Sequence, residues 1–230
     1  MKNRLFLAAA LAAVISSMLA LAPASAKSPV SAGTSLATGL LSPRGMKMGP
    51  DGMIYVAEAG SGGDIDSPTG GPEGPSKSGF TGRISKVDPA TGTRTTVVDN
   101  LPSNGTPGGD SVGPADVAFI GDQLYYVQTH GGDAYGFPGI PTGVYKVTGG
   151  SATLVADIGA YNIANPVTDI SSGTQKDIEP GGNPYSMTVR DGAFYVVDGN
   201  QNQVMKVTTD GAMPVVTGWP GNSVSRLIAP

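Results

Sequence analysis

The chain of 230 residues contains no cysteine and only one histidine, His130. The absence of cysteine excludes disulfides, a thiol nucleophile and cysteine-ligated metal sites. One histidine with no Gly-x-Ser-x-Gly motif argues against a serine–histidine triad and against a zinc site. We therefore predict no catalytic residues, and we expect His130 to be a solvated loop residue. The fold must depend on its hydrophobic core.

The N-terminus has the features of a secretory signal. Lys2 and Arg4 give it a basic start, residues 5–22 are almost wholly apolar, and Ala24-Ser25-Ala26 is a small-x-small cleavage site. We predict cleavage after Ala26 and a secreted or periplasmic protein. An uncleaved membrane anchor is the alternative. No later apolar run is long enough to span a membrane.

Charge and composition narrow the partners. The net charge is −4, and it becomes −6 (12 − 18) once the two basic residues of the signal are removed. An acidic, weakly charged chain is a poor match for nucleic acid or an anionic membrane. With 35 glycines and 19 prolines and no long helical pattern, the chain reads as short strands joined by many turns.

Three stretches repeat at a spacing of 70 residues, beginning at Ser42, Gly113 and Asn183. Three tyrosines keep this spacing: Tyr55, Tyr125 and Tyr195. Three lysine-bearing runs further along each repeat recur at a spacing of 60, with Lys86, Lys146 and Lys206. A fixed period indicates a repeated supersecondary unit that cannot bury its apolar face alone. The lysines are expected to face water or to cover the sheet with their stems.

Each repeat contains four strand signals separated by turn residues such as Asp51-Gly52, Gly121-Asp122 and Asp191-Gly192. The predicted strands are 45–48, 53–57, 83–87 and 95–98; 116–119, 123–127, 144–147 and 153–156; 186–189, 193–197, 204–207 and 214–217. Four antiparallel strands repeated radially form a β-propeller blade. The fold class predicted is therefore all-β, a β-propeller domain over 27–230 with blades near 42–100, 112–158 and 183–218. A β-sandwich with chance similarity is the alternative.

One face of such a propeller would carry the long connections 60–82, 101–113, 131–143 and 158–183, which are expected to lack regular structure. These connections are acidic: Asp64, Asp66, Glu73, Asp110, Asp133, Asp169, Asp177 and Glu179. The face should favour cations or neutral polar ligands. Calcium is the one cofactor that these oxygens suggest, although no EF-hand or Gly/Asp nonapeptide repeat is present.

Three blades do not close a ring, since propellers have four to eight. Val30–Thr38 resembles an outer strand without a blade, and Val224–Ile228 resembles the start of a further one. We therefore expect either a truncated chain or half of a ring that a second copy completes as a homodimer. Asn104-Gly105-Thr106 is a glycosylation sequon, relevant in a eukaryotic secretory pathway.

Two resemblances accompany the repeat. Pro43-Arg44-Gly45, Gly49-Pro50-Asp51-Gly52 and the run 54–58 look like an NHL-type blade. The stretches LSPRGMKMGPDGMIYVAEAGSGG, GPEGPSKSGFTGRISKVDPATG, GPADVAF and NPYSMTVRDGAFYVVDGNQNQVMKV are similar to the ScyD/ScyE family of exported propellers, over about 40–218. That family is linked by name to biosynthesis of the pigment scytonemin, and its members are longer. The resemblance implies fold and export but no catalytic residues.

The candidate ligand-binding residues fall at strand ends on the long-loop side. Glu58, Gln128 and Asp198 close the second strand of each repeat, either as a polar ring for a cation or as clamps on backbone N–H groups of the following loop. The first strands begin with Arg44, Asp116, Tyr185 and Ser186, which differ between repeats as a site requires. Inner strands line the channel of a propeller, so a ligand there would touch them; a solvated channel mouth is the alternative.

Three functions fit this pattern. The first is an exported non-catalytic propeller that binds a protein partner or a small polar or cationic ligand. The second is a metal-dependent lactonase or esterase, similar to gluconolactonase-type propellers, with Glu58, Gln128, Asn183 and Asp198 as candidate ligands. The third is an accessory protein of secondary metabolism.

Overall fold

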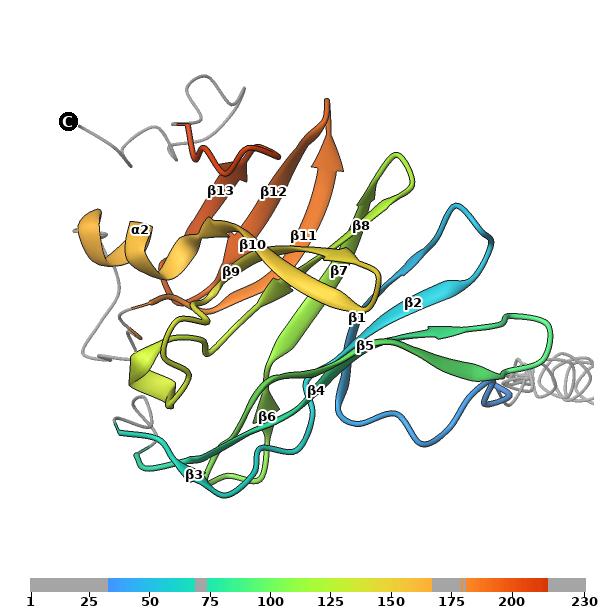
Figure 1. Cartoon of the computed structure of the whole chain (residues 1–230), viewed down its shortest axis with the longest axis horizontal. Helices are drawn as coiled ribbons and strands as arrows, with labels where there is room; N and C mark the ends of the chain where they lie inside the picture. Colours follow the sequence, from blue (N-terminus) through green and yellow to red (C-terminus); the bar gives the residue numbers. More distant parts are fainter. Residues whose placement is uncertain (1–32, 69–73, 167–178, 180, 215–230) are drawn as a thin grey trace, which may run out of the picture. The chain divides into compact units, whose positions relative to one another are not determined.

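The computed structural model describes residues 33–68, 74–166, 179 and 181–214. The chain divides into two compact units, Met1–Ser35 and Leu36–Pro230, and every element below belongs to the second. Within the described residues this unit is all-β apart from two short helices, and it contains three antiparallel sheets (Figure 1).

The three sheets follow one another along the chain. In the first sheet the order is β1 (Pro43–Met48), β2 (Ile54–Glu58), β4 (Lys77–Val87), β5 (Arg94–Gly105) and β6 (Ser111–Val112), with β3 (Ile65–Asp66) beside β4. The second sheet runs β7 (Pro114–Ile120), β8 (Gln123–Gln128), β9 (Gly143–Thr148), β10 (Ser151–Asp157). The third runs β11 (Pro184–Arg190), β12 (Ala193–Asp198), β13 (Gln203–Val207).

The sequence repeat is also a repeat of strand register. A tyrosine of the second strand pairs with the lysine of the third strand in every sheet: Tyr55 with Lys86, Tyr125 with Lys146, Tyr195 with Lys206. The turns between first and second strands carry the positive φ angles expected of their residues, at Gly52, Gly121, Asp191 and Gly192. The predicted antiparallel order of successive strands is confirmed in all three sheets.

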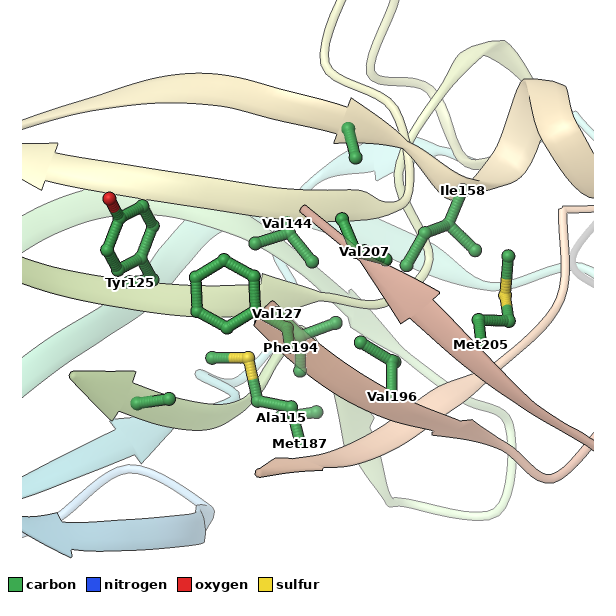
Figure 2. Close-up of a cluster of buried hydrophobic side chains, with 12 residues drawn as sticks. Ala115, Tyr125, Val127, Val144, Ile158, Met187, Phe194, Val196, Met205 and Val207 are labelled. Carbon is green, nitrogen blue, oxygen red and sulfur yellow. The ribbon is translucent and has the colours of Figure 1, made fainter. Parts of the chain in front are cut away.

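Two hydrophobic cores lie between successive sheets. Tyr125, Val127 and Val144 of the second sheet pack against Phe194, Val196 and Met205 of the third (Figure 2). The rings of Tyr125 and Phe194 meet edge-on, with centroids 4.7 Å apart. The other core joins the first sheet to the second, and it contains the following buried residues: Ala57, Ile84, Val98, Leu101, Val117, Leu124, Tyr126, Tyr145 and Val147. Each sheet joint therefore buries one face of each partner sheet.

The predicted loops 60–82 and 101–113 are partly strand, which corrects the sequence analysis. β4 and β5 continue into both segments, and β3 and β6 pair with their extensions. Glycine is normally depleted in strands, but here the backbones approach so closely that a Cβ on Gly79 would lie 2.7 Å from the Cα of Gly63. Glycine at these positions therefore allows the two backbones to lie in contact, and its role there is not flexibility.

Three further predictions need correction. The connection 158–183 begins with helix α2 (Ile158–Ala164), capped by the Asp157 carboxylate, which accepts a bond from Ala160 N at 2.7 Å. The connection 131–143 contains the 3-10 helix η1 (Asp133–Tyr135). The predicted outer strand Val30–Thr38 is not a strand over its described part, residues 33–38.

The signal segment 1–26, the run Val224–Ile228 and most of the predicted strand 214–217 fall outside the described residues; Pro214 itself is not in a strand. Of the helices that the structure describes, neither is long and apolar enough to cross a membrane.

Candidate functional site at the start of the first strands

The first strand of each sheet begins in the same way. A proline pairs with the last residue of the second strand, and a register shift follows: Pro43 with Glu58, Pro114 with Gln128, Pro184 with Asp198. The three first strands are neighbours, with β7 in contact with both β1 and β11 (Figure 1). Their starting residues therefore meet at one place, which is where the sequence analysis placed the candidate site.

Glu58 is a structural clamp. Its carboxylate is fully buried and accepts bonds from Leu41 N at 2.5 Å, Arg83 at 2.6 Å and Ser85 at 2.5 Å. Burial raises the pKa of Glu58, but the bonds from Arg83, Ser85 and Leu41 N outweigh it and hold the pKa below its ordinary value. The charge is thus satisfied within the first sheet and the segment before it.

Asp198 holds the equivalent position in the third sheet. It is fully buried, and one oxygen accepts from Asn183 N at 2.9 Å and Gln201 N at 3.1 Å while the other accepts from Asn162 at 2.8 Å. Burial raises the pKa of Asp198, and these bonds offset the effect only in part. The bond from Gln201 is the predicted clamp on the following loop.

Gln128 completes the set differently, because its amide donates to the carbonyls of Pro102 at 3.1 Å and Thr129 at 2.8 Å. All three side chains are buried and hold backbone in place. The interpretation as clamps is therefore supported, although Gln128 serves carbonyls rather than N–H groups. The three side chains do not come together as a polar ring open to a cation.

Asp116 is also structural rather than exposed. The buried carboxylate accepts from Val117 N at 2.9 Å, Met187 N at 2.9 Å and the Ser186 hydroxyl at 3.1 Å. Lys47 of β1 lies 3.6 Å from the same oxygen that Ser186 and Met187 contact. One side chain of β7 thus connects the first strands of all three sheets.

The remaining predicted residues, Arg44, Asn183 and Tyr185, line one open pocket. The rest of the wall comes from Thr129 and the segment 112–115, which precedes and opens β7. The wall is mostly apolar, because Val112, Pro114, Ala115 and the Tyr185 ring contribute carbon surface. Sequence reasoning missed Thr129 and the segment 112–115 as parts of this site.

Arg44 supplies the positive charge of this pocket. Its guanidinium donates to the carbonyl of Ser111, and a guanidinium has five N–H groups. Other N–H groups of Arg44 thus remain for an acceptor on a ligand. The charged group of the pocket is a cation, so the pocket is not part of the acidic surface expected on the long-loop side.

Asn183 and Tyr185 form the polar corner. The Asn183 amide donates to the Tyr185 hydroxyl at 3.2 Å, and the Asn183 side-chain oxygen is buried without a hydrogen-bond partner among the described residues. Buried acceptors are normally paired, if not by protein then by water or a ligand. The ring of Tyr185 packs against Gly199, where a Cβ would overlap it. The pocket therefore combines an aromatic residue and a guanidinium, and Asn183 beside them has a buried acceptor without a partner among the described residues.

His130 is buried, contrary to the solvated loop residue that was predicted. Its ring stacks on Tyr135 with centroids 4.1 Å apart, and its nitrogens lie 3.2 Å from Asn104 Oδ1 and 3.0 Å from Glu179 Oε2. Burial raises the pKa of Tyr135, and the nearby Glu179 adds to the effect. The cluster joins β5 to residues that flank β8 and β11.

Asn104 explains why the sequon is inaccessible in the folded chain. Its amide donates to Ser76 at 2.7 Å and Ser78 at 2.8 Å, and the residue is buried. A glycan therefore has no room at this asparagine once the chain has folded.

The calcium prediction is not tested. Within the described residues no three His, Asp or Glu side chains come together as a metal site. Asp66 pairs with Lys77 at 2.5 Å, and Glu73, Asp169 and Asp177 lie outside the described residues. The lactonase set of Glu58, Gln128, Asn183 and Asp198 also remains a prediction.

Comparison with known proteins adds no constraint: neither a protein-family model nor a curated protein matches the chain. The functional argument therefore depends on the geometry of the pocket.

Proposed function

We propose that the chain is an exported, non-catalytic β-propeller that binds a small ligand in the pocket of Arg44, Asn183 and Tyr185. The propeller is supported by three successive antiparallel sheets, of which each packs on the next. Export is supported by the signal-like segment 1–26. A role in secondary metabolism depends only on the resemblance to the ScyD/ScyE family.

The single observation that carries the ligand is the guanidinium of Arg44 in the wall of a pocket that is otherwise mostly apolar. A guanidinium binds an acceptor such as a carboxylate or carbonyl. The pocket wall includes Tyr185, an aromatic residue. A flat ligand with a carbon body and one acceptor fits these features.

This ligand class differs from the cationic ligands that the acidic loops suggested. Acidic side chains of the described loops, such as Asp64, Asp66 and Asp133, are not among the residues that line the pocket. A cation would face the guanidinium of Arg44 at close range, and like charges repel. We therefore expect the pocket to prefer carboxylates and neutral polar molecules.

A matched probe panel tests the proposal. The protein is titrated by ligand-observed NMR with 4-hydroxybenzoate, 4-hydroxybenzylamine and glucose, which differ in charge and in aromatic surface. Binding of 4-hydroxybenzoate that weakens at least tenfold in Arg44→Ala and in Tyr185→Ala supports the proposal. Lys86→Ala, a cation at the far turn of the first sheet, is the matched control. Preference for the amine, or binding insensitive to both pocket variants, overturns it.

A further inference from the structure

The outer face of the third sheet is an apolar surface whose counterparts in the other two sheets are buried. Val197 and Val204 are 43% and 41% exposed. Their equivalents by the repeat are Val127 and Val144 in the second sheet and Ala57 and Ile84 in the first, and all four are 0% exposed. In those sheets the next sheet of the chain covers the face.

The first sheet has its opposite face exposed along β1, although Val56 and Val87 on the same face are buried. Met46 and Met48 of β1 are 63% and 60% exposed. Val117 and Met187 occupy the position of Met46 in β7 and β11, because each pairs with the equivalent residue of the second strand. Both are buried against the preceding sheet, at 0% and 1% exposure. The exposed methionines mark the face that a preceding sheet would cover.

These two faces match each other. Twice within the chain, the face equivalent to that of Val197 in one sheet packs against the face equivalent to that of Met46 in the next sheet. This occurs between the first and second sheets and between the second and third. Within the described residues, each of these two faces therefore has exposed apolar side chains at positions that are buried elsewhere in the repeat. Exposed apolar residues that cluster on one face can mark an interaction surface.

We propose that a second copy of the chain covers both faces, with the third sheet of each copy packed on the first sheet of the other. Two equal joints form, and a two-fold axis relates them, so the assembly closes and no apolar face remains. The six sheets that result lie within the range of four to eight found in closed propellers. This inference concerns the sheet faces and does not depend on ligand binding in the pocket.

The packing between successive sheets within the chain indicates which partner would cover the two exposed faces. A partner without this repeat would have to reproduce the cross-strand pattern that buries Tyr125 and Val127 against Phe194 and Val196. A second copy has the equivalent strand register, because its first sheet carries Ile54 at the position of Phe194 and the exposed Met46 at the position of Met187. Flat apolar faces with mutually matching registers associate more specifically than unrelated apolar surfaces.

The experiment is light scattering after size exclusion on the full chain, over about a hundredfold range of concentration because association depends on it. Two charged variants are then compared, each first checked for folding by circular dichroism. One carries Val197→Lys and Val204→Lys on the third sheet; the other carries Met46→Asp and Met48→Asp on the first. Ile163→Lys on helix α2, where Ile163 is 65% exposed, is the control.

The proposal predicts a dimer for the wild type and the control and a monomer for each charged variant alone. Mixing the two variants should restore a dimer, since one joint then pairs lysine with aspartate and the other pairs two unaltered faces. A folded wild-type monomer at every concentration overturns the proposal, as does a dimer that both charged variants retain. Failure of the dimer leaves the probe titration of the pocket unaffected, so the two proposals are tested separately.

Discussion

The carboxylate of Asp116 accepts a hydrogen bond from the backbone N–H of Met187 at 2.9 Å, across the boundary between the second and third sheets. The two residues are 71 positions apart, so this one bond connects consecutive repeats. Lys47 of the first sheet contacts the same carboxylate oxygen. The pocket residues Arg44 and Tyr185 lie on the strands that Asp116 holds together.

Replacement of Asp116 should therefore loosen the joints that shape the pocket. Asp116→Ala leaves the Met187 N–H buried without its acceptor, and we expect a loss of about 3 kcal/mol in the free energy of unfolding. Urea denaturation measures it. Asp99→Ala, which removes an exposed carboxylate, should change stability by less than about 0.5 kcal/mol. Equal effects of the two variants would contradict the bridging role.

Gly45 tests the same joint from the other side. A methyl group there would overlap the Asp116 carboxylate and lie 2.8 Å from its Cα. Gly45→Ala should cost about 1 to 3 kcal/mol, as overpacking does. The control Gly108→Ala places its methyl 3.8 Å from the nearest atom, the Thr106 hydroxyl. Thermal unfolding of the pair distinguishes crowding from the general effect of a glycine substitution, and an unchanged Gly45→Ala would show that β1 and β7 are not in contact.

Glu58 predicts a pH dependence. Its pKa is lowered in the folded chain, so its contribution to stability is present above the unfolded pKa, near 4.5, and is lost as the pH falls through the folded pKa. Glu58→Gln should cost about 2 kcal/mol at neutral pH, because Arg83 loses its charged partner. Urea titrations should show that this difference shrinks as the pH falls through the folded pKa. A difference that stays constant with pH would mean that the carboxylate is not ionised in the fold.

The single histidine makes the burial of His130 directly measurable. Diethyl pyrocarbonate modifies exposed imidazoles, and mass spectrometry of peptides from the modified chain locates the adduct at this residue. We expect slow modification in the folded protein and fast modification in urea, because the ring is stacked on Tyr135. Tyr135→Ala should speed the reaction in the folded chain. Rapid modification of the folded wild type would contradict the burial of His130 and would support the solvated loop residue predicted from the sequence.

Calcium separates the proposed function from the hydrolase alternative. The carboxylates of Glu58 and Asp198 are already occupied by N–H and O–H donors, so we expect no rise in melting temperature with added calcium. A ligand that binds only the folded state raises it. A clear rise, accompanied by turnover of a lactone or ester, would favour the metal-dependent hydrolase.

Much of the sheet structure was predictable because it is local and repeated. The tyrosine and lysine registers, the turns at Asp191-Gly192 and the clamp position of Asp198 all follow from periodicity and turn chemistry. The same register argument anticipated that Arg44 and Tyr185 begin neighbouring strands. These features depend on residues close in sequence or on copies at equal spacing.

The errors have a common cause, which is contact between distant backbone segments. The strand extensions at Gly79 depend on the approach of Gly63, which no local propensity records. The burial of His130 depends on Asn104 and Glu179, 26 and 49 residues away. The pocket wall at 112–115 depends on the approach of Arg44 and Tyr185, which lie about 70 residues away on either side.

The most direct test of the proposed function is a ¹⁵N NMR titration with 4-hydroxybenzoate. The structure predicts that shift changes concentrate on the amides of Gly113, Thr129, Asn183 and Tyr185, which line the pocket, and that they disappear in Arg44→Ala. Shift changes that are absent, or that gather on the acidic loop around Asp64 and Asp66, would contradict a ligand site at the start of the first strands.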